Sequence, residues 1–308
     1  MSWESPRIHD LRFGPVEGGP LQRAVAAPGR GGSSVDDAVF ALTTDDVRQA
    51  CDVLHPVYER SAGIDGRVSI EVDPRLAQDA GSTAAMARKL WETVDRPNLF
   101  IKIPATRAGL EAITAVTAEG ISVNVTLIFS LDRYHDVMHA YLRGWSRLRP
   151  RDTTWRHPLG GLLLRFPRRR RGRPPPRRHR HRGGPGTQGT TAIANARLAF
   201  QAYEQLLVDP RWQRLAAAGA RTQRPLWAST GVKDPNLPDT MYVRELVIAG
   251  TVNTMPGGTL AAFADHGTLP AHAPTRGRLH GSQGPLSPRW HGSASTSPTS
   301  PTHWSARG

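Results

Sequence analysis

The chain has 308 residues, with 38% apolar residues, 26 prolines and 30 glycines, so it is long enough for a buried core but rich in residues that interrupt regular structure. Its formal net charge is +14, and the segment from Arg143 to Arg182, which holds fifteen arginines and one acid, Asp152, accounts for all of that charge. No apolar run approaches the roughly 20 residues of a membrane-spanning helix, which excludes a helical membrane protein.

Residues 1–33 are rich in Gly, Pro, Ser and Arg, and this composition predicts a disordered N-terminal segment. The opening MSWESPRIHD lacks the apolar stretch of a secretory signal. From Ser34 the pattern is helical, and Ser34 and Thr44 precede acidic residues, as expected of helix N-caps. The single cysteine, Cys51, lies in this helical stretch, and because it cannot form an internal disulfide we predict a cytoplasmic protein.

Strand and helix patterns alternate from residue 67 onward. Three predicted strands are each followed by a helical pattern, and this alternation is typical of a parallel sheet. A helix is predicted at 191–207, and two more apolar strands follow it. The five predicted strands are 67–73, 98–106, 121–129, 224–230 and 250–256. Residues 161–190, between the third and fourth strands, show no helical or strand period.

The first three predicted strands share one distribution of side chains. Successive side chains of a strand point to opposite faces, and in each of these strands one face is wholly apolar. The other face carries polar groups near its centre: Glu71, Lys102, Asn124 and Thr126. A sheet covered by helices on both faces would be apolar on both, whereas a closed barrel admits polar groups inside its carboxyl end. We therefore expect these four side chains to converge on one pocket of an α/β barrel.

Lys102 is the residue of this set that indicates covalent chemistry. It lies in the apolar sequence NLFIKIPAT and is one of only three lysines among 40 basic residues. A buried lysine can lose its proton, whereas an arginine cannot. A neutral amine attacks a ketone and forms a Schiff base, which acts as an electron sink when a C–C bond is cleaved. We expect Glu71 to move protons through a water oriented by Thr126, and Asn124 to bind a substrate hydroxyl.

The same residues also allow a purely structural interpretation. Lys102 would then lie on an edge strand with its amine in solvent, and Glu71 would be its ion-pair partner. Asn124 and Thr126 would be ordinary strand-surface residues. The recurrence of polar-centred strands in three consecutive strand–helix units favours the catalytic interpretation.

Ser229 and Lys233 lie in the sequence WASTGVKDP, at the end of a predicted buried strand. A Ser-Thr-Gly turn with a nearby lysine, at the carboxyl end of such a strand, suits a phosphate group. Turns of this kind are common, so the signal is weak by itself.

Several long motifs resemble the transaldolase family in its actinobacterial form. These motifs are RVSIEVDPRLA, NLFIKIPATRAGLEAI, GISVNVTLIFSLDRY, ANARLAFQAYE, RPLWASTGVKDP and GTVNTMP. The resemblance implies a (β/α)8 barrel that needs no cofactor and no metal. It also implies transfer of a dihydroxyacetone unit from sedoheptulose 7-phosphate or fructose 6-phosphate to an aldose phosphate, in the pentose phosphate pathway.

The motif match assigns a role to each candidate residue. Lys102 resembles the Schiff-base lysine and Glu71 the acid/base carboxylate. Asn124 and Thr126 match positions beside that carboxylate. The phosphate-binding residues that the match implies are Ser229 and Lys233.

Parts of the chain depart from the family pattern. The resemblance covers 34–145 and 191–266, whereas the N-terminal segment 1–33, an Arg/Pro-rich insert at 146–190 and a low-complexity tail at 267–308 do not match. We interpret these three segments as out-of-frame readings of a GC-rich gene, a hypothesis that translation of the source DNA in the other two frames tests. Because about five of eight strands are recognisable, we expect an incomplete barrel that folds poorly and is weakly active or inactive.

Two other functions compete with the transferase. Residues 143–182 predict salt-dependent, non-specific binding of nucleic acid or another polyanion. A simple class I aldolase would share the lysine chemistry and lack the acceptor. Sugar phosphates are the expected partners, membranes are not, and the sequence does not indicate an oligomeric state.

Overall fold

The structure, a computed structural model, describes residues 34–148, 161–165 and 187–269. Six parallel strands form one sheet, and their order in space is their order in the chain. The strands are β1 (Val68–Glu71), β2 (Leu99–Pro104), β3 (Val123–Ile128), β4 (Gly161–Arg165), β5 (Arg224–Ala228) and β6 (Val252–Thr254). Within the described residues no pairing joins β1 to β6, so the sheet is open there. This arrangement confirms the predicted incomplete barrel.

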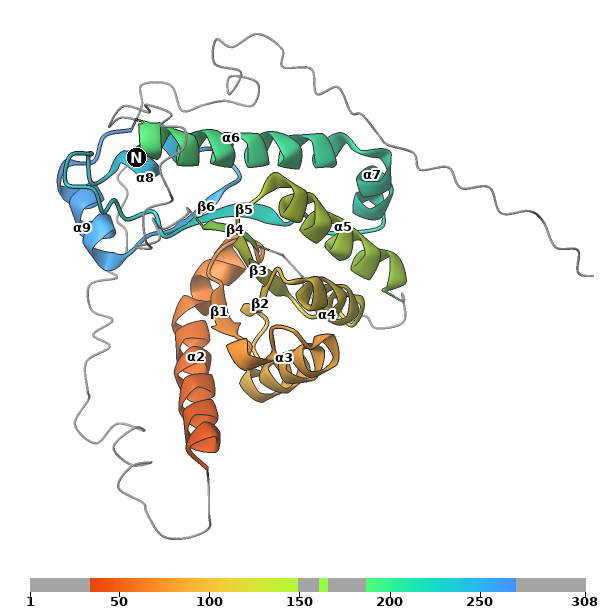
Figure 1. The fold of residues 1–308 in the computed structure, drawn as a ribbon. Helices are drawn as coiled ribbons and strands as arrows, with labels where there is room; N and C mark the ends of the chain where they lie inside the picture. The colour runs from red at the N-terminus through yellow and green to blue at the C-terminus, as the bar shows by residue number, and fades with distance from the viewer. Residues whose placement is uncertain (1–33, 149–160, 166–186, 270–308) are drawn as a thin grey trace, which may run out of the picture.

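Helices connect and cover the strands on the outside of the sheet, as Figure 1 shows for α3, α4 and α5. The helices are α2 (Val35–Arg60), α3 (Ala80–Val94), α4 (Arg107–Ala118), α5 (Leu131–Arg147), α6 (Thr187–Val208), α7 (Pro210–Ala217), α8 (Met241–Leu246) and α9 (Gly257–His266), with a short 3₁₀ turn at Pro74–Leu76. Each of the first three strands leads into a helix that returns the chain to the next strand, as parallel pairing requires.

Local sequence explains where these helices begin. The hydroxyl of Ser34 accepts a hydrogen bond from the backbone N–H of Asp37, and the Asp37 carboxylate accepts one from the Ser34 N–H, so α2 starts with a capping box. The hydroxyls of Thr106 and Ser130 cap α4 and α5 by accepting a hydrogen bond from the backbone N–H three residues ahead, without the reciprocal bond of a capping box. The expectation of a second cap at Thr44 is wrong. That residue is buried inside α2, and its hydroxyl donates to the carbonyl of Phe40.

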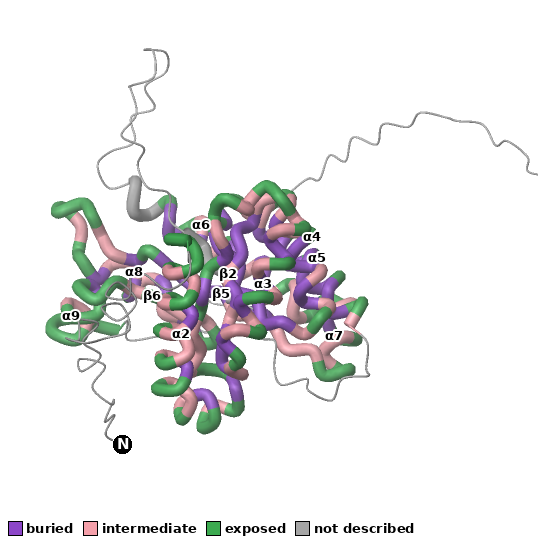
Figure 2. The backbone as a smooth tube through the Cα atoms, turned by 90° about the horizontal axis from the view of Figure 1, so that it is seen from below, coloured by how far each residue is buried: buried purple, intermediate pink, exposed green. Residues whose placement is uncertain are grey.

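The outer face of the sheet forms the main core. Ile101 and Ile103 of β2 and Val123 and Val125 of β3 are fully buried against the helices, and Figure 2 shows buried backbone along β2 and β5. These are the side chains whose alternation along each strand predicted an apolar face. Their burial leaves the opposite face of β1, β2 and β3 for the polar residues.

The expectation that residues 161–190 lack regular structure is wrong at both ends of that segment. Residues 161–165 form β4, which pairs in parallel with β3 and β5, and α6 begins at Thr187 rather than at 191. The sequence of β4, GLLLR, is a short apolar run without the alternation of apolar and polar residues that identifies a half-exposed strand. The described chain therefore contains six strands, one more than the sequence pattern predicts.

The remaining segments, 1–33, 149–160, 166–186 and 270–308, lie outside the described residues, and so does most of the predicted disorder. Among the helices that the structure describes, none has the length and apolar character needed to cross a membrane.

Candidate active site

Lys102 and Glu71 face each other across the first pair of strands. They are register partners of β2 and β1, and the Lys102 Nζ lies 3.0 Å from the Glu71 Oε2. The Lys102 side chain is 27% exposed and that of Glu71 is 46% exposed, so the lysine is half-buried and the carboxylate is exposed, and Lys102 is less enclosed than the apolar sequence around it predicts. A carboxylate at this distance is within reach for direct proton exchange with an amine or with a group bonded to it.

Asn124 continues this row on β3, where it is the register partner of Lys102. It is 5% exposed, and its Nδ2 donates a hydrogen bond of 3.0 Å to the Ser69 Oγ of β1. Its Oδ1 is buried and has no hydrogen-bond partner among the described residues. A buried carbonyl oxygen without a donor is costly, and a substrate hydroxyl would supply the missing donor.

Thr126 lies two residues further along β3 and is paired in register with Pro104. It is almost fully buried, and its backbone carbonyl accepts a hydrogen bond from Ala105. Ser69 was not assigned a role from the sequence. It lies two residues before Glu71, on the same strand face, and that spacing is the signal by which it could have been found.

Aromatic and basic residues fill the sheet face on the amino-terminal side of this row. Phe100 precedes Lys102 by two residues, and the guanidinium of Arg67 lies 4.8 Å from the centre of its ring. The same guanidinium lies 4.9 Å from the ring of Tyr58. The pKa of Arg67 is lowered to about 10, mainly by burial, and the nearby charges of Arg221 and Arg224 act in the same direction. These groups lie on the amino-terminal side of the Lys102–Glu71 pair.

Ser229 and Lys233 lie on the turn that follows β5. Ser229 is exposed and has a left-handed backbone with φ of 57°. A Cβ on Gly231 would come within 3.2 Å of the Thr259 Oγ1 of α9, so this turn rests closely on the start of that helix. The hydroxyl of Thr230 donates to the Oδ1 of Asn253 on β6, at 2.8 Å, which fixes the turn from its other side.

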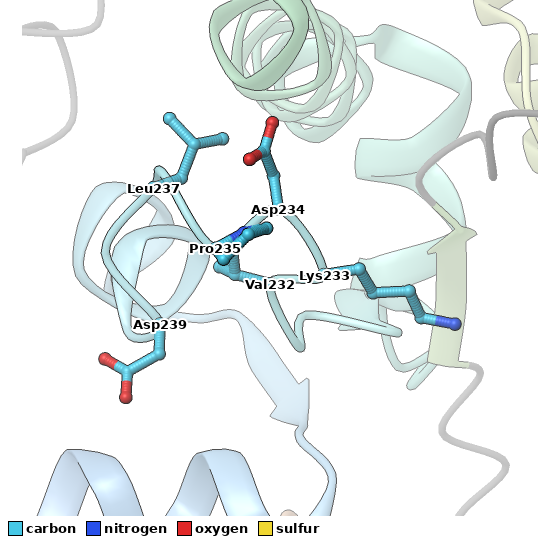
Figure 3. A pocket seen from close by; sticks show the side chains of 6 residues that line it. All are labelled: Val232, Lys233, Asp234, Pro235, Leu237 and Asp239. Carbon is cyan, nitrogen blue, oxygen red and sulfur yellow. The ribbon is translucent and has the colours of Figure 1, made fainter.

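A pocket of about 460 Å³ lies beside this turn and is lined by Val232, Lys233, Asp234, Pro235, Leu237 and Asp239. Figure 3 shows the Lys233 side chain extending away from the two carboxylates of the pocket. Among the described residues, no ion pair involves Lys233. Its amine is therefore available to an anion.

The six candidate residues thus form two groups. Glu71, Lys102 and Asn124 make one row across β1, β2 and β3, and Thr126 lies next to that row. Ser229 and Lys233 lie at the carboxyl end of β5, with β3 and β4 between them and Lys102 in the sheet. Glu71 and Lys102 lie in the carboxyl halves of β1 and β2, Asn124 lies near the start of β3, and Ser229 and Lys233 lie beyond the end of β5. The described residues contain no cluster of three or more His, Cys, Asp or Glu side chains that would hold a metal ion.

The arginine-rich segment lies mostly outside the described residues. Arg143 and Arg147 are its two members on α5, and both are exposed. The prediction of polyanion binding through 143–182 therefore stays a prediction.

Comparison with known proteins identifies the family. The family model of transaldolase/fructose-6-phosphate aldolase matches residues 17–281, which extends beyond both ends of the predicted resemblance and across the central insert. The chain is 55% identical to a transaldolase of Parafrankia over 244 residues, 57% identical to one of Thermobifida fusca over 246 residues, and 51% identical to transaldolase 1 of Streptomyces avermitilis over 281 residues.

These matches cover 78%, 77% and 89% of this chain, and 65%, 65% and 72% of the three relatives. The chain thus spans somewhat less than two thirds of the length of the first two. A (β/α)8 barrel is the fold of this family, which agrees with six parallel strands in sequential order. From the match over most of its length and the high identity to its relatives, we conclude that the chain belongs to the transaldolase/fructose-6-phosphate aldolase family.

Proposed function

We propose that this protein is a transaldolase that acts through a Schiff base on Lys102. The substrates would be a ketose phosphate, sedoheptulose 7-phosphate or fructose 6-phosphate, and an aldose phosphate that accepts the three-carbon unit. The observation that carries the proposal is the row on the inner face of three parallel strands, in which the Lys102 Nζ lies 3.0 Å from the Glu71 Oε2 and the neighbouring, buried Asn124 Oδ1 has no hydrogen-bond donor among the described residues. An amine and a proton acceptor at this distance are what Schiff-base formation requires.

The proposed mechanism gives each residue of the row a proton or a hydroxyl to handle. The Lys102 amine attacks the ketone carbon, and loss of water from the resulting carbinolamine leaves the Schiff base. Glu71 gives and takes the protons of these steps, directly or through a water beside Thr126. The unpaired Oδ1 of Asn124 accepts a hydrogen bond from a hydroxyl of the bound sugar, while Ser69 holds its Nδ2.

The phosphate of the substrate would bind at the Ser229–Lys233 turn. The amine of Lys233, which extends away from the carboxylates of the pocket, would supply charge, and the exposed Ser229 on the same turn would supply a hydroxyl. Separation of this turn from Lys102 by β3 and β4 suits a sugar phosphate whose reacting carbon and phosphate lie at opposite ends of the molecule.

We place this reaction in the cytoplasm because the single cysteine is free and buried. Burial raises the pKa of Cys51 to about 11, so its thiol is not a second nucleophile of the protein.

Trapping with borohydride tests the proposal directly. The purified chain is incubated with fructose 6-phosphate, reduced, digested and analysed by mass spectrometry. We expect a reduced three-carbon adduct on Lys102, which is absent in Lys102→Arg and Lys102→Ala. Lys89→Ala is the matched control, because Lys89 packs over the ring of Phe40 on the helical layer and should leave trapping unchanged.

Addition of erythrose 4-phosphate separates transfer from simple cleavage. A transaldolase forms sedoheptulose 7-phosphate, whereas a class I aldolase yields only free dihydroxyacetone and glyceraldehyde 3-phosphate. The proposal is wrong if no adduct forms on Lys102 in protein that a thermal melt shows to be folded.

A further inference from the structure

Two strained residues lie at the carboxyl edge of the sheet. Positive φ angles occur at four non-glycine residues of the described chain: Ala62, Asp95, Leu127 and Ser229. Ala62 and Asp95 follow the ends of α2 and α3, where a left-handed residue is an ordinary way to terminate a helix. Leu127 and Ser229 instead lie where β3 and β5 end. Leu127 is the unusual case, because a bulky side chain disfavours this conformation strongly.

A β-bulge accounts for the position of Leu127. From one paired position to the next, β3 advances three residues, Val125 to Ile128, while β4 advances two, Leu162 to Leu164. The extra residue interrupts the alternation of the strand. Ile128 is fully buried in the main core, whereas Leu127 is 37% exposed. Bulges of this kind redirect a side chain and are frequent next to active sites.

The bulge puts an exposed apolar residue next to Thr126 in the chain, at the carboxyl end of β3. Leu127 directly follows Thr126, whose register partner lies two residues beyond Lys102 on β2. Phe129, also exposed, comes after it. An exposed leucine in a strained conformation adds little to packing, so stability does not explain why this residue is a leucine. Strain that surrounding structure maintains at such a place is typical of a functional constraint.

We propose that Leu127 lines the reaction centre and keeps water from the three-carbon adduct, so that the adduct is transferred rather than released. This inference rests on the proposed Schiff-base function of Lys102. Its physical basis is that an apolar wall excludes solvent from a reactive intermediate.

Transfer and release diverge at the enamine that remains on Lys102 after the C–C bond breaks. In transfer, the enamine carbon forms a C–C bond with the aldehyde carbon of the acceptor, and the aldehyde oxygen takes up a proton. Water then adds to the C=N carbon of the new ketose, the C–N bond breaks, and sedoheptulose 7-phosphate leaves with the amine of Lys102 restored. In premature release, the enamine carbon takes a proton from solvent instead. Water then adds to the C=N carbon, the C–N bond breaks, and dihydroxyacetone leaves with the amine of Lys102 restored. Solvent at the enamine carbon therefore decides between the two outcomes.

The test measures how the adduct partitions in Leu127→Asn and Leu127→Gly. Asparagine and glycine both accept a left-handed backbone, so these variants remove the apolar group without adding strain. With fructose 6-phosphate and erythrose 4-phosphate present, we expect the ratio of released dihydroxyacetone to sedoheptulose 7-phosphate to rise about tenfold or more in both variants. Leu127→Met keeps the apolar bulk and should stay within about twofold of the wild type.

The ratio is insensitive to how much of a variant folds, because both products come from the same adduct. Ala62→Gly is the control for relief of backbone strain at another place. Ala62 also has a positive φ, of 51°, but it lies between α2 and β1. This substitution should leave the ratio of the two products unchanged. If the wild type forms the adduct and neither Leu127→Asn nor Leu127→Gly changes the ratio, this inference is overturned alone. If the wild type forms no adduct on Lys102, the proposed function is overturned and the inference with it.

Discussion

The first three strands and the last two use the inner face of the sheet differently. In β1, β2 and β3 this face carries the polar row of Glu71, Lys102 and Asn124, held by hydrogen bonds between side chains. In β5 and β6 it carries a small apolar cluster built around Leu226 and Val252. The first region thus holds its polar groups within the strands, whereas the second offers them mainly in the turn after β5. The comparison teaches that the proposed covalent chemistry and the proposed phosphate binding would use separate parts of one sheet.

The largest expected effect falls on the first region, through Glu71→Gln. Glutamine keeps the shape of the side chain and a polar contact with Lys102, but it cannot take up the proton. Loss of a general acid/base group lowers the rate by roughly 10²–10⁴-fold. We expect such a fall in kcat for transfer from fructose 6-phosphate, measured with erythrose 4-phosphate as acceptor.

Glu119→Gln is the matched control for this change. Glu119 is also an ion-paired carboxylate, bound to Arg88 at 2.6 Å, but it lies at the end of α4 and away from the sheet interior. Its substitution should leave kcat within about twofold, as expected for an exposed ion pair. A kcat for Glu71→Gln equal to that of the control would remove Glu71 from the mechanism.

The polar row could be predicted because side chains alternate between the two faces of a strand. Alternation of side chains along 67–73, 98–106 and 121–129 places Glu71, Lys102 and Asn124 on one face, and the register of three neighbouring strands then brings them into one row. The face of each residue is thus predicted from its own strand, and the neighbourhood of the three strands from the alternation of strand and helix.

The features that were not predicted depend on residues that are distant in sequence, or lie in segments whose apolar residues show no helical or strand periodicity. β4 was missed because its short leucine run is embedded in arginine-rich sequence. The bulge at Leu127 exists only in relation to β4, so a missed strand made the bulge unpredictable as well. The Ser69–Asn124 hydrogen bond joins residues 55 positions apart, and side-chain pairing at that range does not follow from strand alternation.

The two regions should also differ in how much their buried side chains stabilise the fold. Ile101→Ala removes a fully buried side chain from the main core, where α3 and α4 pack on β2, and should cost about 2–5 kcal/mol of unfolding free energy. Leu226→Ala opens a site in a small cluster with few apolar neighbours, and we expect a cost at the low end of this range, about 2 kcal/mol. Urea unfolding followed by tryptophan fluorescence measures both. Equal losses would contradict the division of the sheet into a heavily packed and a lightly packed part.

Lys233→Ala sharpens the assignment of phosphate binding to the second region. An interaction with a remote phosphate that is equal in the ground state and the transition state changes KM and not kcat. We expect KM for fructose 6-phosphate to rise about tenfold with kcat within about twofold, the effect of losing one charge-assisted contact. Steady-state kinetics with unphosphorylated fructose is the control, since its KM should not change. A fall in kcat with unchanged KM would instead place Lys233 in the chemistry.

The smallest expected effect is on the melting temperature, through an exposed histidine of α9, His266, which contacts Asp239 in the segment after β5. The His266 Nε2 lies 3.0 Å from the Asp239 Oδ1 in the lining of the pocket, and its Nδ1 lies 3.1 Å from the Asp265 Oδ2. The hydrogen bond to Asp239 is the main cause that raises the pKa of His266 above its usual 6.5, and the same bond lowers the pKa of Asp239.

The sign of the pH dependence follows from these two shifts. A histidine whose pKa is raised by folding stabilises the fold fully below its unfolded value, and this contribution is lost as pH rises through the folded pKa. The contribution of Asp239 is present above its usual pKa of 3.8 and is lost as pH falls through its lowered value. Wild type should therefore melt at a higher temperature than His266→Gln at pH 5.5, and the difference should disappear by pH 9. Asp239→Asn should behave like His266→Gln at both values, because it removes the same contact from the other side. If the melting temperatures of wild type and His266→Gln differ by the same amount at pH 5.5 and pH 9, the contact between His266 and Asp239 does not depend on the charge of the histidine.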